Sequence, residues 1–101
     1  MKLKHKFKAV RTEYNGFKFA SKKEAKRYME LKALEQAGEV EFFFMQTPIH
    51  LPEGVKYVLD FQVYWANGEI TFEDVKGFKT PIYELKKKQV EALYPIKITE
   101  I

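Results

Sequence analysis

The sequence has no cysteine, only two histidines and no long apolar run, and each absence excludes a class of protein. Without cysteine the chain cannot form disulfide bonds or a cysteine-ligated zinc site, and it suits a reducing compartment. His5 and His50 are too far apart to predict a histidine-based metal site. No segment approaches the roughly 20 apolar residues of a transmembrane helix, and the N-terminal residues lack the apolar core of a signal peptide. We therefore expect a cytoplasmic protein with no membrane partner.

The length and composition predict one folded domain over residues 1–101. A chain of 101 residues has room for one modest core. Apolar residues make up 46% and aromatic residues 16% of the sequence, which is more than a disordered tail would carry. No internal repeat, low-complexity tract or linker divides the chain.

Positive charge gives the first indication of a partner. The formal net charge is +4, and each basic cluster taken alone is consistent with a solvated surface. Three clusters in so short a chain favour a phosphate-rich ligand such as nucleic acid. The clusters are Lys2, Lys4, Lys6, Lys8 and Arg11; Lys22, Lys23, Lys26 and Arg27; and Lys86, Lys87 and Lys88.

The first predicted helix covers residues 21–37. Ser21 is a favourable N-cap, and Glu24 follows it at the capping-box spacing. Gly38 is a natural end for the helix. Before it we expect a basic arm or edge strand over residues 1–12 and an Asn-Gly turn over residues 14–17.

The rest of the chain predicts a helix among four strands. Thr80 caps a second helix over residues 80–93, and Pro81 takes its first position. Strands are predicted over residues 40–46, where Thr47-Pro48 ends the run, and over residues 56–65, 69–76 and 96–101. The order α-β-β-β-α-β predicts an α/β (mixed α+β) fold, with a mixed sheet and a helix on each face.

Two aspartates interrupt the predicted hairpin, where apolar side chains would be expected. With a three-residue loop over residues 66–68, paired positions sum to 134, so Asp60 lies opposite Asp74. With a two-residue loop the sum is 135, and the two aspartates point to opposite faces. We predict the first register, because Gly68 suits the left-handed residue of a three-residue loop.

In that register the carboxylates of Asp60 and Asp74 would hold a divalent cation. They lie roughly 5 Å apart at Cβ, and each resists ionising unless a positive charge lies between them. Mg²⁺ or Mn²⁺ supplies that charge and prefers oxygen ligands. Lys76 points to the same side as Asp74, whereas Glu73 points to the other face. The pattern is also compatible with a hairpin that turns its polar side chains to solvent.

Two helical residues extend this candidate site. Glu24 lies on the stripe of its helix that faces the sheet, so it either reaches the metal site or completes the capping box, or does both. Lys86 lies between Ile82 and Val90 on the apolar stripe of the second helix. It either meets a counter-charge at the site or is an edge lysine whose ammonium reaches solvent.

These residues resemble a known pattern. An acidic residue in the first helix, Leu59-Asp60 in the second strand and Asp74-Val75-Lys76 in the third resemble the PD-(D/E)XK nuclease superfamily. Leu59 stands where the pattern has proline. The longer pattern FxSKKEAKRYxELKxLExAGE…DVKGFKT is similar to a small phage-borne nuclease family related to Holliday-junction resolvases and recombination endonucleases. The resemblance covers residues 7–100.

By this resemblance Asp60 and Asp74 bind the metal ion together with the backbone carbonyl of Val75, and Glu24 binds it directly or through water. Lys76 orients the attacking water or helps to deprotonate it. The residues expected to contact DNA are Lys22, Lys23, Arg27, Gln46, Lys79 and Lys86.

The resemblance implies an Mg²⁺- or Mn²⁺-dependent endodeoxyribonuclease that resolves Holliday junctions in phage recombination or replication, in the cytoplasm of the host cell. Symmetric cutting of branched DNA calls for a homodimer, formed through the basic arm or the apolar strand over residues 40–45. Two alternatives are a nuclease for single-stranded, flap or nicked DNA and a non-catalytic binder of double-stranded nucleic acid. The fold of that binder, α-β-β-β-α, lacks the last strand.

Overall fold

The structure, a computed structural model, describes residues 11–101, so the expected basic arm lies almost entirely outside the described part. A hairpin of β1 (Thr12–Tyr14) and β2 (Phe17–Phe19) comes first and forms a separate two-stranded sheet. Its turn is the predicted one: Asn15 and Gly16 have φ values of 56° and 84°, as a two-residue hairpin loop requires.

Both predicted helices begin at their predicted caps. In α1 (Lys22–Gln36) the Ser21 side chain accepts a hydrogen bond from the Glu24 N–H at 3.0 Å. Thr80 accepts the corresponding bond at the start of α2 (Pro81–Leu93), at 3.1 Å. Local capping chemistry is enough to place these boundaries. Neither helix of the described residues is long and apolar enough to cross a membrane.

The main sheet is mixed. Its strands β3, β4 and β5 are antiparallel, and β6 pairs parallel to β5. In the order of the sheet the strands are β3 (Val40–His50), β4 (Lys56–Trp65), β5 (Ile70–Asp74) and β6 (Ile98–Glu100). A short 3₁₀ turn, Pro52–Gly54, joins β3 to β4. The predicted α/β class and core order are confirmed, including the last strand.

The boundaries of three strands differ from the prediction. β3 continues through Thr47-Pro48 to His50 and does not end at Gln46. Proline is tolerated there because β3 is an edge strand, so a missing backbone N–H need not remove a ladder bond. The strands β5 and β6 are each shorter than predicted, because their regular pairing with neighbouring strands covers only residues 70–74 and 98–100.

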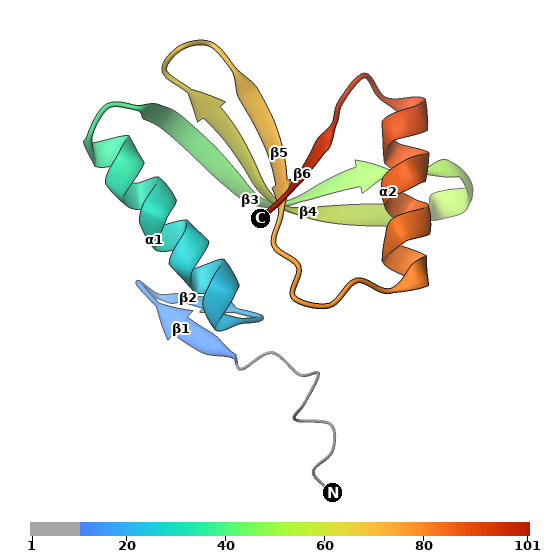
Figure 1. Cartoon of the computed structure of the whole chain (residues 1–101), viewed down its shortest axis with the longest axis horizontal. Helices are drawn as coiled ribbons and strands as arrows, with labels where there is room; N and C mark the ends of the chain where they lie inside the picture. Colours follow the sequence, from blue (N-terminus) through green and yellow to red (C-terminus); the bar gives the residue numbers. More distant parts are fainter. Residues whose placement is uncertain (1–10) are drawn as a thin grey trace, which may run out of the picture.

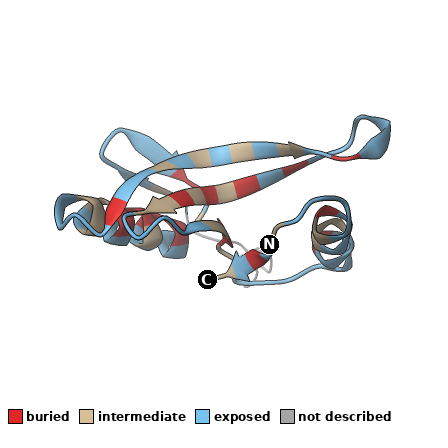
Figure 2. Cartoon of the chain, turned by 90° about the horizontal axis from the view of Figure 1, so that it is seen from above, coloured by how far each residue is buried: buried red, intermediate tan, exposed pale blue. Residues whose placement is uncertain are grey.

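The two helices lie on the same side of the long β3–β4 hairpin, and β5 and β6 run between them (Figures 1 and 2). Buried side chains alternate along β4. Phe61 and Val63 pack with α1, whereas Tyr57 and Leu59 belong to the cluster around α2. The buried side chains on one face of β4 therefore contribute to both halves of the core, the cluster at α1 and the cluster at α2.

The prediction of a helix on each face holds for β5 alone. Glu73 contacts α1 through Arg27, while its neighbour Phe72 packs in the α2 cluster. Strands twist relative to one another in a sheet, so the β3–β4 hairpin can present one face to both helices. Its opposite face carries the exposed Phe42 and Phe44, and Phe42 stacks on Tyr64 with ring centroids 4.4 Å apart.

Candidate metal and DNA site

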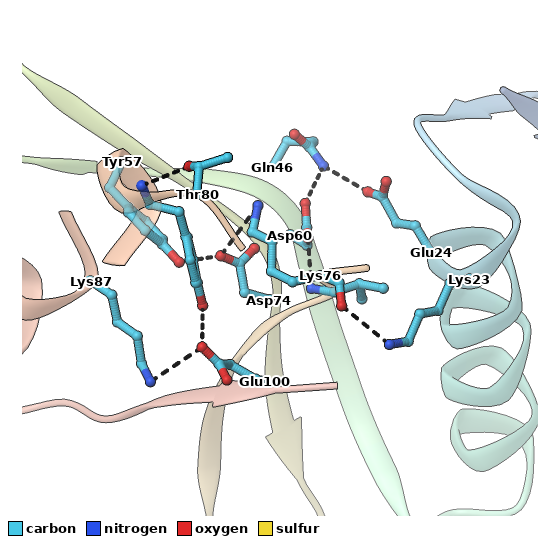
Figure 3. A network of polar contacts seen from close by, with 12 residues as sticks. Lys23, Glu24, Gln46, Tyr57, Asp60, Asp74, Lys76, Thr80, Lys87 and Glu100 are labelled. Carbon is cyan, nitrogen blue, oxygen red and sulfur yellow. Dashed lines mark hydrogen bonds and ion pairs between the residues drawn. The ribbon is translucent and has the colours of Figure 1, made fainter. Parts of the chain in front are cut away.

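The register of the β4–β5 hairpin brings the two aspartates together. Phe61 pairs with Glu73, so the next positions along the two strands, Asp60 and Asp74, face each other. Gly68 takes the left-handed conformation in the loop, with φ of 93°. The predicted three-residue register is confirmed, and Figure 3 shows the two aspartates close together in one polar network.

Asp60 lies next to Phe61, the first residue of β4 that pairs with β5. The Val75 N–H donates to Asp60 Oδ2 at 2.9 Å, and the Gln46 side-chain amide donates to Oδ1 at 3.4 Å. The neighbouring residues Leu59 and Phe61 are fully buried, one in each half of the core. The half-buried carboxylate of Asp60 therefore lies at the boundary between the two halves.

Asp74 is almost fully buried, with 1% of its surface exposed. The Tyr57 hydroxyl donates to its Oδ2, and Lys76 Nζ lies 3.8 Å from the same oxygen. Its other oxygen, Oδ1, is buried without a hydrogen-bond partner. Burial and the nearby Asp60 raise the pKa of Asp74 to about 7, although Tyr57 and Lys76 act in the opposite direction. A buried carboxylate in this position lacks a positive or donor group on one side.

Glu24 reaches the same place from α1. Its Oε1 accepts a hydrogen bond from the Ala20 N–H at 3.2 Å, and its Oε2 accepts one from the Gln46 amide at 3.0 Å. Burial and the charge of Asp60 raise the pKa of Glu24. The capping box is therefore only half formed, because Glu24 accepts from the Ala20 N–H and not from the N–H of the N-cap Ser21. Its other oxygen points to Gln46, beside the aspartates (Figure 3), and a role in metal binding stays a prediction.

Gln46 joins Glu24 to Asp60, since its amide nitrogen donates to both carboxylates. Its backbone is left-handed, with φ of 54°, a conformation that costs a non-glycine residue on the order of 1–2 kcal/mol. Such residues cluster at functional sites. A neutral donor therefore lies between two acidic groups, in a backbone conformation that the surrounding structure has to maintain.

Lys76 lies beside Asp74, as predicted. Its ammonium is 4.8 Å from the centroid of the Tyr83 ring, and 31% of its side chain is exposed, so it remains accessible to a ligand. The Lys76 carbonyl accepts a hydrogen bond from Lys23 Nζ at 3.3 Å, which connects α1 to the same segment.

A second polar network, absent from the sequence prediction, borders the site. The Tyr83 hydroxyl donates to Glu100 at 2.9 Å, and Lys79 and Lys87 form ion pairs with Glu100 at 2.8 and 3.4 Å. Chiefly Lys79 and then Tyr83 lower the pKa of Glu100 to about 2. Glu100 is the β6 residue that pairs with Asp74. No sequence signal identifies this network, because only tertiary packing brings α2 and β6 together.

Two residues expected to contact DNA have partners inside the fold. Arg27 donates to both carboxylate oxygens of Glu73, at 2.8 and 2.6 Å, and to Glu30 at 3.2 Å. These acids compensate its charge within the fold, and a contact of Arg27 with DNA stays a prediction. Lys79 is likewise paired with a carboxylate of β6, whereas Lys22 is exposed.

The inward stripe of α2 also differs from the prediction. Ile82 is 67% exposed, and Tyr83 and Val90 are the buried residues of this helix. Tyr83 takes the inward position because its ring packs in the core and its hydroxyl has a carboxylate partner. Lys87 shares that stripe by its helical spacing. Lys86 lies next to it, where its ammonium donates to a backbone carbonyl at the start of β4 at 3.5 Å.

The two aspartates carry the kind of oxygen ligand that magnesium and manganese prefer. Among residues 11–101, no three His, Cys, Asp or Glu side chains are grouped closely enough to form a metal cage. Mg²⁺ rarely uses such a cage, because it binds through one or two carboxylates and completes its shell with water and substrate phosphate. Asp60 and Asp74, with the unpartnered Oδ1, supply such a pair.

The chain belongs to the family DUF1064, which is described as a protein of unknown function and whose model matches residues 4–101. No curated protein and no solved structure matches the chain. The family description assigns no activity.

Proposed function

We propose that this member of the DUF1064 family is a divalent-metal-dependent endonuclease of the PD-(D/E)XK type that hydrolyses phosphodiester bonds in DNA. One observation carries the proposal: Asp60 and Asp74 face each other on β4 and β5, and a buried oxygen of Asp74 has no hydrogen-bond partner. Glu24 of α1 lies next to this pair, because the Gln46 amide donates to both Glu24 and Asp60. An internal ion pair accounts for the neighbouring buried acid, Glu73. No such partner accounts for Asp74 Oδ1.

In this proposal Asp60, Asp74 and the Val75 carbonyl hold Mg²⁺ or Mn²⁺, with Glu24 as a direct or water-mediated ligand. A bound metal ion of this kind lowers the pKa of water and stabilises negative charge on a phosphate. The Gln46 amide positions Glu24 and Asp60 relative to each other through its two hydrogen bonds.

Lys76 would orient the attacking water or contact the phosphate that is cut, since its partly exposed side chain places the ammonium beside Asp74. Tyr57 would be a positioning residue. It donates to Asp74 Oδ2 and thereby leaves Oδ1 as the oxygen available to a ligand.

We propose branched DNA, such as a Holliday junction, as the substrate. Cutting two strands symmetrically requires a two-fold dimer, and β3 is suited to forming one. It is an edge strand of 11 residues with exposed Phe42 and Phe44, and a long apolar edge favours pairing with another chain. Analytical ultracentrifugation that found only monomer at micromolar concentration would remove the dimer and leave single-stranded, flap or nicked DNA as the substrate.

The decisive experiment measures cleavage of labelled four-way, flap, nicked and linear DNA with Mg²⁺, with Mn²⁺ and with EDTA. We expect the wild type to cut only with metal. Asp74→Asn should lose cleavage but keep or gain DNA affinity, because it removes one negative charge. Glu69→Gln, which removes the charge of an exposed residue in the loop between β4 and β5, is the matched control and should cut normally.

Cleavage by Asp74→Asn at the wild-type rate, or cleavage in EDTA, would contradict the proposal. DNA binding by the wild type without any metal-dependent cleavage would favour the non-catalytic binder.

A further inference from the structure

A cavity of about 300 Å³ lies next to the candidate metal site, between the start of β4, the end of β5 and the start of α2. Asp74 and Lys76 line it, so it opens from the same residues that the proposed chemistry uses. Its remaining lining includes Lys56, Lys86 and Ile82. A ligand held at Asp74 would therefore extend directly into this cavity.

The charge of the cavity is positive and largely uncompensated. Three lysines line it, whereas Asp74 is the only carboxylate that does. In the part of the chain that the structure describes, neither Lys56 nor Lys86 forms an ion pair with an acidic side chain, and Lys86 only donates to the Lys56 carbonyl. The lysines Lys79 and Lys87, which do not line the cavity, are both paired with a carboxylate. The ammonium groups of Lys56 and Lys86 therefore lie beside the cavity without an acidic partner.

The residues that line the cavity indicate which kind of anion it would bind. Thr80 lines the cavity and caps α2, so the positive end of the helix dipole lies at its edge. Val58 and Ile82 are also part of the lining, with 48% and 67% of their surfaces exposed. Ammonium groups beside exposed apolar side chains suit a phosphate that carries a sugar, because the sugar can cover the apolar surface.

We propose that this cavity binds one DNA phosphate and its sugar, in the nucleotide next to the bond that is cut. Lys56 and Lys86 contact the phosphate, and Val58 and Ile82 contact the sugar. The inference rests on the proposed nuclease function and adds to it the residues that hold the neighbouring nucleotide.

The first test compares Ile82→Glu with Leu85→Glu. Both residues are exposed apolar residues of α2, 67% and 58% exposed, but only Ile82 lines the cavity. Binding of fluorescein-labelled single-stranded DNA is followed by anisotropy in EDTA, so that cleavage plays no part. A carboxylate at position 82 repels the phosphate and should weaken binding about tenfold, against about twofold or less for Leu85→Glu. Equal effects of the two variants would overturn the proposal.

The second test compares Lys86→Ala with Lys88→Ala, since Lys88 is an exposed lysine of the same helix outside the cavity. Loss of one phosphate contact should lower the slope of log K against log salt by about 0.7 for single-stranded DNA. We expect this change for Lys86→Ala and a smaller one for Lys88→Ala. The same change in both variants would indicate general surface attraction and overturn the proposal. Circular dichroism melts verify that each variant folds.

Strands with a 5′-phosphate, a 3′-phosphate or neither distinguish the source of the phosphate. If the protein prefers one phosphorylated end and Lys86→Ala abolishes that preference, the cavity binds a terminal phosphate. If all three strands bind equally and Lys86→Ala weakens the binding of each, the cavity binds an internal phosphate. Because these measurements use EDTA, their failure is separable from failure of the nuclease proposal. A wild-type protein that never cuts DNA refutes the nuclease proposal. Equal changes of the salt slope in Lys86→Ala and Lys88→Ala refute only the proposal that the cavity binds a phosphate.

Discussion

Glu73 and Asp74 are neighbours in β5, and both are buried, with 2% and 1% of their surfaces exposed. They point to opposite faces and meet different surroundings. Glu73 meets Arg27, which donates to both of its oxygens. Asp74 meets Tyr57 and Lys76 at one oxygen, and nothing donates to the other.

The difference separates an acid that is compensated within the fold from one that, under our proposal, binds a metal ion. A buried charge with a bidentate arginine is compensated within the fold. A buried carboxylate with an unpartnered oxygen destabilises the fold unless a ligand supplies the missing charge. Burial and acidity alone therefore do not distinguish Glu73 from Asp74, whereas the incomplete pairing of Asp74 does.

Glu73→Gln should have the largest effect on stability. It leaves the half-buried Arg27 without its main counter-charge, and we expect a loss of about 3 kcal/mol in the free energy of unfolding. Urea denaturation in EDTA measures this. Glu30→Gln removes the exposed partner of the same arginine and should cost less than about 0.5 kcal/mol. Equal losses would mean that the Arg27–Glu73 pair is not the structural contact that we infer.

Asp74→Asn should increase the free energy of unfolding at neutral pH, whereas Glu73→Gln decreases it. The pKa of Asp74 is raised from 3.8 to about 7, so between these values the folded state binds more protons than the unfolded state. The wild type in EDTA should therefore be stabilised by this group below pH 3.8 and lose that contribution as the pH rises through about 7. Asparagine does not titrate, so the stability of Asp74→Asn relative to wild type should increase with pH. Urea denaturation at several pH values would contradict this if the difference between the two proteins stayed constant.

Two substitutions of Gln46, whose amide donates to Asp60 and Glu24, separate the effect of its hydrogen bonds from that of its strained backbone. Gln46→Ala removes its hydrogen bonds and keeps the left-handed backbone, whereas Gln46→Gly removes the bonds and relieves the strain. The glycine variant should be more stable than the alanine variant by about 1 kcal/mol, although glycine is normally the less stable residue in a strand. Thermal melts of the two variants measure the difference. A more stable alanine variant would show that the positive φ is not maintained in solution.

Glu100→Gln should give the smallest effect. Glu100 is paired with Lys79, Lys87 and Tyr83, which lower its pKa from 4.5 to about 2. A lowered pKa stabilises the fold above the ordinary value, and that contribution is lost as the pH falls from 4.5 towards 2. Wild type and Glu100→Gln should therefore differ slightly in melting temperature at neutral pH and converge in acid. A difference that persists at low pH would argue against this pairing.

The elements that could be predicted are those governed by neighbouring residues. Ser21 and Thr80 start the helices through side-chain bonds to amides three residues away. Gly68 sets the hairpin loop and hence the register that aligns Asp60 with Asp74. The extension of β3 through Pro48 escaped prediction because it depends on β3 being an edge strand, a property of the assembled sheet.

The composition of the candidate site divides in the same way. The spacing of Asp60, Asp74 and Lys76 along one hairpin follows from strand alternation and loop length, which are local. The partners of those groups come from segments distant in sequence: Tyr57 reaches Asp74, Gln46 reaches Glu24, and Arg27 reaches Glu73. Hydrogen bonds between distant segments depend on how helices and strands pack, and no rule of periodicity or capping encodes that packing. The sequence therefore determines which acidic groups lie on which strand. Whether the charge of each acid is compensated by a partner depends on the tertiary packing.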